Sequence, residues 1–259
     1  RRARIRQAHR APAVCDPSRN TLRTTGPSHR ASTRAIRDPG MEPAFGAGSL
    51  ASWVTCCPVV PVSDPKADLH RYLQTAREVL LWKLDGLSEY DVRRPMTPTG
   101  TTLLGLVKHV ASAEAGYFGV VFRRPFGEPL PWYEEDAEPN ADMWATADES
   151  REQIVGFYHR VWAHSDVTID TLELDAVGHV PHWPKHRSEV TLHQILVHMT
   201  AETHRHAGHA DIIRELIDGA VGLRPDNDNM APGDQSWWDE YRRRLERVAR
   251  QADSGSTER

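Results

Sequence analysis

The chain has 259 residues, a formal net charge of −4 and three cysteines. That length accommodates one large domain, or one moderate domain with tails, and no segment approaches the roughly 20 apolar residues of a membrane-spanning helix. The cysteines all lie within the first 57 residues, so nothing indicates the disulfide framework of a secreted protein. We therefore expect a cytoplasmic protein with no membrane partner.

The first 40 residues differ in composition from the rest of the chain. They contain ten Arg, no Lys and two acidic residues, a formal +8, which leaves −12 for residues 41–259. A basic arm can bind nucleic acid, but this one lacks aromatic residues and helical periodicity, so we expect no nucleic-acid partner. Because the chain begins with Arg1 and its first Met is Met41, we interpret residues 1–40 as translated upstream sequence or a disordered extension, with a transit peptide as the alternative. Residues 1–60 as a whole are expected to be a disordered tail.

The body of the chain carries start signals for its principal helices. Asp64 as N-cap, followed by Pro65, predicts a first helix that ends near residue 87. A second helix is predicted over residues 101–122, and the Pro-rich, aromatic residues 123–145 are interpreted as an ordered loop. Residues 146–149 have the capping-box pattern, which predicts a third helix from there to about residue 165.

The longest helix is predicted near the end of the body. Residues 169–187 alternate weakly and are broken by Pro181 and Pro184, which predicts a short hairpin or an extended crossover. A long helix follows from residue 188 or 191 to 218, and a shorter amphipathic helix covers residues 236–251. The expected fold class is all-α: an up-down four-helix bundle over residues 64–252, with a long crossover before the last helix, a C-terminal accessory helix and a disordered tail at 253–259.

Three polar residues interrupt the apolar stripe of the long helix. Alternating steps of four and three residues select Ile195, Met199, Glu202, His206, His209, Ile213 and Leu216. Burying the three central side chains without partners would cost several kcal/mol each, so they need a ligand, a proton network or water. Glu202 and His206 are four residues apart and reach one point on the helix face, as a helical metal-ligand pair does.

His109 interrupts the core-facing stripe of the second predicted helix in the same way. With Glu202 and His206 it makes a set of two His and one carboxylate, which is the ligand set of a catalytic zinc or other divalent ion with an open fourth position. The alternative interpretation is that each of the three is a core polar residue satisfied by hydrogen bonds. His209, one turn beyond His206, is either an alternative ligand or a base beside the ligands.

Three stretches around these residues resemble the DinB-like superfamily and, within it, the mini-circle-type proteins of actinobacteria. They are GTTLLGLVKHVASAE at residues 100–114, LVHMTAETHRHAGHADIIRELIDG at 196–219 and WKLDGLSEYDVRRP at 82–95. The resemblance covers about residues 65–252 and implies a bundle with a divalent metal on three side chains. The commoner pattern has three His, and Glu202 departs from it. The set His109, Glu202 and His206 instead resembles that of mycothiol-dependent maleylpyruvate isomerases, which bind zinc.

Three kinds of function are compatible with this site. The first is an enzyme that uses zinc, or nickel or iron in its place, and a low-molecular-weight thiol such as mycothiol to conjugate or isomerise a small electrophile. In such an enzyme His209 or Arg205 would assist as proton donor or anion anchor. The second is a metal-dependent hydrolase acting at the same open position. The third is a non-catalytic, metal-stabilised homodimer, with the aromatic residues 237–241 in its interface and His209 as a fourth ligand.

Overall fold

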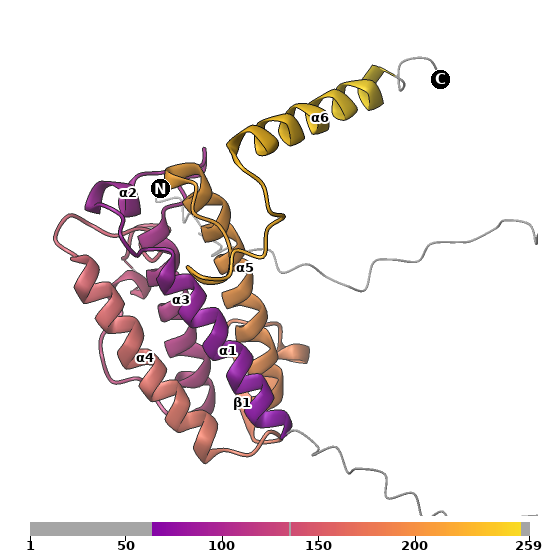
Figure 1. Cartoon of the computed structure of the whole chain (residues 1–259). Coiled ribbons are helices and arrows are strands. Elements are labelled where there is room, and N and C mark those ends of the chain that lie inside the picture. The colour runs from indigo at the N-terminus through magenta and orange to yellow at the C-terminus, as the bar shows by residue number, and fades with distance from the viewer. Residues whose placement is uncertain (1–63, 135, 255–259) are drawn as a thin grey trace, which may run out of the picture. The chain divides into compact units, whose positions relative to one another are not determined.

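The computed structural model describes residues 64–134 and 136–254, and this part of the chain is mostly helical (Figure 1). Its helices are α1 (Pro65–Trp82), α2 (Glu89–Arg93), α3 (Leu103–Phe118), α4 (Arg151–Thr171), α5 (Leu192–Asp218) and α6 (Gln235–Ser254). Three 3-10 turns and two short strands complete it: η1 (Val120–Phe122), η2 (Pro131–Tyr133), η3 (Lys185–Arg187), β1 (Val177–His179) and β2 (Glu189–Thr191). The tail predicted at residues 1–60 lies outside the described residues. Of the C-terminal tail predicted at residues 253–259, residues 253 and 254 are instead the last two of α6, because the helix continues beyond its predicted end at 251, and the rest lies outside the described residues.

Side-chain caps explain where the principal helices begin and end. Asp64 caps α1, as predicted, and Thr102 caps α3, each accepting a hydrogen bond from a backbone N–H of the first turn. Thr191 forms a capping box with Gln194 at the start of α5. That helix ends at Gly219, whose φ of 81° lies in the left-handed region that favours glycine.

The start of α4 differs from the prediction. The helix begins at Arg151, because Ser150 and Gln153 form the capping box, and it continues to residue 171 rather than 165. The predicted cap is used one turn earlier, where Thr146 N donates to the Glu149 carboxylate at 2.8 Å. The pattern at residues 146–149 therefore stabilises a turn that precedes the helix, and does not form the N-terminal cap of the helix.

The first two predicted helices are shorter in the structure. The chain leaves α1 after Trp82, and a short unpredicted helix, α2, follows with Ser88 as its cap. α3 ends at Phe118, because the backbone at Gly119 (φ −98°, ψ −91°) is no longer helical, and the 3-10 turn η1 follows. The predicted first helix includes residues between α1 and α2, and the predicted second helix includes η1.

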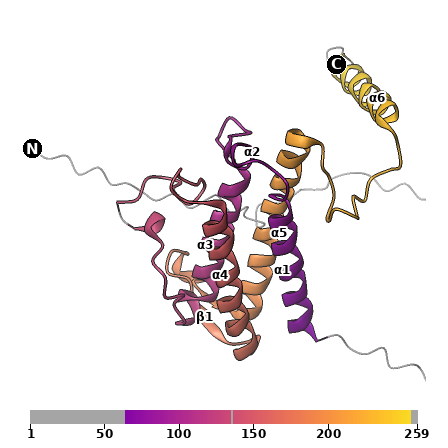
Figure 2. The same cartoon turned by 60° about the vertical axis from the view of Figure 1, so that its left-hand side comes forward.

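α1, α3, α4 and α5 pack around a shared core (Figures 1 and 2). α3 contacts both α4 and α5, and α5 also contacts α1. The antiparallel pair β1–β2 forms the hairpin expected in the crossover, with Gly178 opposite Val190. A Cβ at Gly178 would lie 2.8 Å from the ring of Phe122, so this glycine lets the hairpin close over the core beside η1. The packing brings one face of α3 against one face of α5.

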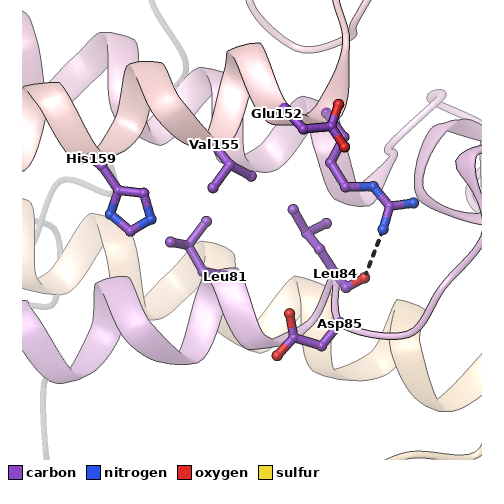
Figure 3. A pocket seen from close by; sticks show the side chains of 7 residues that line it. Leu81, Leu84, Asp85, Glu152, Val155 and His159 are labelled. Atoms are coloured by element: carbon purple, nitrogen blue, oxygen red, sulfur yellow. Dashed lines mark hydrogen bonds between the residues drawn. The ribbon is translucent and has the colours of Figure 1, made fainter.

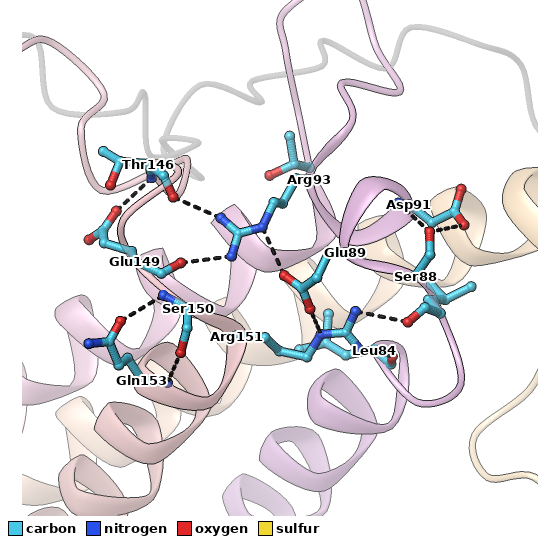
Figure 4. A network of polar contacts seen from close by, with 12 residues as sticks. Leu84, Ser88, Glu89, Asp91, Arg93, Thr146, Glu149, Ser150, Arg151 and Gln153 are labelled. Carbon is cyan, nitrogen blue, oxygen red and sulfur yellow. Dashed lines mark hydrogen bonds and ion pairs between the residues drawn. The ribbon is translucent and has the colours of Figure 1, made fainter.

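A polar junction joins α2 to the beginning of α4 (Figure 4). Arg93 donates to the carbonyl oxygens of Thr146 and Glu149 at 2.8 and 2.7 Å. Arg151 pairs with the Glu89 carboxylate at 2.8 Å. These contacts fix the C-terminal end of residues 119–150, which we call the α3–α4 connection.

The accessory helix α6 is amphipathic. Trp237 stacks on Tyr241 with ring centroids 5.2 Å apart, and Trp238 meets both rings edge-on. Among the described residues, no helix is both long and apolar enough to cross a membrane.

Candidate metal centre

The centre is built first on α5, where Glu202 and His206 lie one helical turn apart. His206 is 7% exposed, and its Nε2 donates to Glu202 Oε1 at 3.0 Å. Side chains four residues apart on a helix are neighbours, so α5 itself sets this contact. The pairing predicted from sequence spacing is present in the structure.

His109 joins the pair from α3. Its Nε2 lies 3.7 Å from Glu202 Oε1, and its ring centroid is 4.9 Å from that of His206, edge to face. One potential ligand atom from each of the three residues lies within 4.8 Å of the others. The packing of α3 against α5 therefore brings together the three residues that the sequence singled out on two separate helices.

Asp142 is a fourth member of the site that sequence reasoning missed. Its Oδ2 accepts a hydrogen bond from His109 Nδ1 at 2.6 Å. Asp142 belongs to the α3–α4 connection, where no periodicity or fixed spacing relates it to His109. The one available signal was the aromatic, Pro-rich composition of this segment, which predicted order but no partner. The hydrogen bond leaves Nε2 as the His109 nitrogen that faces Glu202.

His209 lies beside the centre rather than within it. Its Nδ1 is 3.4 Å from Nδ1 of His206, and the rings meet edge to face with centroids 5.3 Å apart. His209 thus approaches the nitrogen of His206 that is turned away from Glu202. Of the two roles predicted for it, the position fits a proton partner of His206 better than a direct ligand.

Charge at the centre is balanced between carboxylates and imidazoles. Hydrogen bonds from His109 and His206 hold the pKa of the Glu202 carboxyl well below its usual range. Burial lowers the pKa of His109, but its hydrogen bonds to Asp142 and Glu202 outweigh burial and raise it to about 9. At neutral pH the His109 imidazolium is therefore held between two carboxylates.

Other histidines gather at an aromatic cluster beside the centre, where Tyr117 and His198 both interact electrostatically with Glu202. Tyr117 of α3 meets His198 of α5 with ring centroids 4.7 Å apart, and Trp183 meets His198 at 5.3 Å. The Tyr117 hydroxyl lies 3.4 Å from Nε2 of His182. The sequence assigned His182 no role, because a contact between the crossover and two helices has no spacing signature.

A pocket lies elsewhere, between α1 and α4 (Figure 3). Its lining residues are Leu81, Leu84, Asp85, Arg151, Glu152, Val155 and His159, none of which belongs to the candidate centre. Arg151 at its rim donates to the carbonyl of Leu84 at 3.4 Å, so the one cation of the lining is already engaged in the fold.

The donor set fits a divalent metal. Two imidazoles and one carboxylate are the protein ligands of many catalytic zinc sites, which leave a further position open. The ionised state of Glu202 suits a cation, and the Asp142–His109 hydrogen bond is the outer contact that metal-ligating His residues usually make. His109 must lose its extra proton to bind a metal through Nε2. His206 must move its proton from Nε2 to Nδ1, and that N–H can then donate a hydrogen bond to Nδ1 of His209.

A comparison with protein families covers the part of the chain that contains this cluster. Residues 68–219 match the sequence profile described as Mycothiol-S-transferase. The chain therefore belongs to the mycothiol-S-transferase family, a DinB-like family, and the predicted resemblance is confirmed. The matched range contains His109, Asp142, Glu202, His206 and His209. A search of curated proteins finds no match to the chain.

Proposed function

We propose that the protein is a metal-dependent enzyme in which the thiolate of mycothiol attacks a small electrophile, which leads either to conjugation of mycothiol through its sulfur or to isomerisation of the substrate. His109, Glu202 and His206 are the proposed ligands. Zinc is the proposed metal because this set resembles that of mycothiol-dependent maleylpyruvate isomerases, and nickel or iron are alternatives because two imidazoles and a carboxylate also suit them. The observation that carries the proposal is the convergence of these three side chains within 4.8 Å in a chain of the mycothiol-S-transferase family.

The residues have distinct roles in this proposal. When bound, a divalent metal stabilises the thiolate form of a coordinated thiol near neutral pH. Glu202 supplies the negative charge that offsets the cation, and Asp142 orients the His109 ring. His209 is the proposed proton acceptor through Nε2, since its Nδ1 lies against His206 and the carboxylates of Glu202 and Asp142 are engaged with other groups. Burial lowers the pKa of His209, which favours the neutral form needed to take up a proton.

Calorimetric titration of mycothiol into the full chain tests this function. We expect binding to the zinc-loaded protein and no binding to the metal-stripped protein, because the thiolate requires the cation. A mycothiol analogue without the sulfur atom is the matched ligand control and should bind much more weakly. Equal binding with and without zinc would contradict the proposal.

Two alternative functions use the same residues, and the same titration distinguishes both of them from the thiol-dependent transferase. A hydrolase would bind zinc without binding mycothiol, and would cleave small esters or amides. A non-catalytic, metal-stabilised homodimer would bind zinc with His209 as a closing fourth ligand. The family match favours the thiol-dependent transferase over both.

Several broader expectations accompany the proposal. We interpret α1, α3, α4 and α5 as an up-down four-helix bundle within a domain of residues 64–252, with α6 as its accessory helix. The pairwise packing of the four helices supports this interpretation. Four expectations stay predictions: the cytoplasmic location, the homodimer, membership of the mini-circle branch and the interpretation of residues 1–60 as a tail.

A further inference from the structure

We propose that the α3–α4 connection is a positioning element of the metal centre, which sets the orientation of His109 through Asp142. This inference rests on the proposed metal site and assigns a role to a segment outside the three ligands. Asp142 is a positioning residue in this proposal, because it acts on the metal through His109.

The α3–α4 connection approaches α3 closely at Gly105, a contact between the Gly105 and Met143 backbones that we call the notch. A Cβ at this position would lie 1.8 Å from the carbonyl oxygen of Met143, so only glycine allows the two backbones to approach this closely. Gly105 precedes His109 by one helical turn and therefore lies on the same side of α3. Because Asp142 immediately precedes Met143 in the chain, the close approach carries its carboxylate to the His109 ring.

Two buried side chains of α3 hold the connection on either side of Asp142. Trp132 Nε1 donates to Ser112 Oγ at 2.8 Å. Lys108 Nζ donates to the carbonyl oxygen of Trp144 at 3.1 Å and pairs with the Glu149 carboxylate at 2.7 Å. Ser112 is fully buried and Lys108 is 2% exposed, so the α3 side of each contact is shielded from water, while the partners in the connection are partly exposed. The connection is fixed both before and after Asp142.

These contacts place the Asp142 carboxylate beside Nδ1 of His109. Asp142 Oδ2 accepts a hydrogen bond from His109 Nδ1 at 2.6 Å, which keeps that nitrogen protonated and directs Nε2 toward Glu202. A ligating histidine can rotate or adopt the other tautomer when the ring nitrogen that does not bind the metal has lost such a partner. Loss of an outer partner of this kind typically lowers metal affinity about 10- to 100-fold.

Zinc affinity of the full chain, measured by competition with a chromophoric chelator, tests the role of Asp142. We expect D142N and D142A to weaken zinc binding about 10- to 100-fold. D148N removes the same charge from an exposed position in the same connection and should bind zinc as the wild type does. Wild-type affinity in D142A would overturn the inference.

A second pair of variants tests the notch without touching Asp142 or a ligand. G105A would push the Met143 backbone away and carry Asp142 with it, so zinc affinity should fall about 10-fold. G116A is the matched control, because this glycine is also on α3 and an added Cβ would meet nothing within 4 Å. Both changes raise helix propensity, so a loss confined to G105A reports the close approach itself. Equal affinities of the two variants would contradict the notch.

A readout that needs no metal separates this inference from the proposed function. The ring N–H of His109 should give a slowly exchanging nitrogen-15 NMR correlation in metal-free wild-type protein and in D148N, and none in D142A. If that signal is absent from the wild type, or persists in D142A, the positioning role is wrong whatever the metal does. If the signal behaves as expected but the wild type binds no divalent metal, the proposed function fails and Asp142 orients His109 for another purpose.

Discussion

Glu202 and His206 lie one turn apart on α5, and Glu202 Oε1 accepts a hydrogen bond from His206 Nε2 at 3.0 Å. The same oxygen lies 3.7 Å from His109 Nε2 on α3. One carboxylate thus links imidazoles from two helices. When a metal binds, those contacts are exchanged for coordination, so this carboxylate bears on both metal affinity and the stability of the metal-free fold.

The first prediction concerns removal of that carboxylate. E202A should weaken zinc binding by on the order of 100-fold or more, because it removes one of three ligands and the negative charge that offsets the cation. E202Q should weaken it nearly as much, since the amide keeps the volume and loses the charge. Competition with a chelator measures both affinities.

The control for this prediction lies on the same helix. Glu215 is exposed on α5, and E215A changes the net charge by the same amount away from the centre. Its zinc affinity should match that of the wild type. Stoichiometric zinc binding at full strength in E202A would show that Glu202 is not a ligand.

The second prediction concerns the pH dependence of the metal-free protein. The pKa of His109 is about 9 in the folded state, above its ordinary value of 6.5. The folded protein therefore holds a proton that the unfolded chain releases between these values, and stability falls as pH rises through this window. The contribution of His109 is fully present below about pH 6.5 and is lost above about pH 9.

Urea unfolding of chelator-treated protein between pH 6 and pH 10 measures this effect. H109Q should remove the part of the slope that His109 contributes. D142N should shift the fall in stability toward lower pH, because it removes one of the two carboxylates that raise the pKa of His109. A pH profile in H109Q identical to that of the wild type would contradict the assignment.

The third prediction concerns a buried ion pair in the core. Arg77 and Glu114 have no exposed side-chain surface, and Arg77 Nη2 lies 2.5 Å from Glu114 Oε1. R77M would leave the Glu114 carboxylate buried without its cation, and would also remove the contact of Arg77 with Asp166 at 2.8 Å, so it should lower the free energy of unfolding by about 3–5 kcal/mol. The double variant R77M/E114L removes both charges and should recover a large part of that loss.

An exposed pair provides the comparison. Arg160 and Glu128 meet at 2.7 Å with both side chains largely exposed, so R160M should cost only about 0–1 kcal/mol. Denaturant unfolding of the three variants, R77M, R77M/E114L and R160M, measures the difference. A loss in R77M no greater than that in R160M would show that the buried pair adds nothing to stability.

The fourth prediction distinguishes a proton partner from a fourth ligand. H209A should retain one zinc per chain with at most about a 10-fold loss of affinity, because His209 contacts the outer nitrogen of His206. H206A removes a ligand and should lose far more. Equal losses in the two variants would indicate a closed, four-ligand zinc, which favours the non-catalytic alternative.

The sequence alone determined the features that depend on neighbours along the chain. A side-chain cap located the start of α1, whereas the start of α5 was left open between residues 188 and 191. The spacing of Glu202 and His206 predicted their contact, because helix geometry brings residues four apart together. The beginning of α4 was misplaced by one turn. Two consecutive capping patterns precede that helix, and choosing between them depends on how the preceding connection packs.

The residues that face Glu202 and His206 depend on the tertiary packing of the chain. His109 reaches Glu202 because α3 packs on α5 in one particular register, which spacing within either helix does not specify. Asp142 reaches His109 because the connection packs at Gly105, and no pattern in the connection encodes that contact. Local hydrogen bonding determines which residues share a helix face, whereas the partners of that face depend on close packing between segments far apart in the chain.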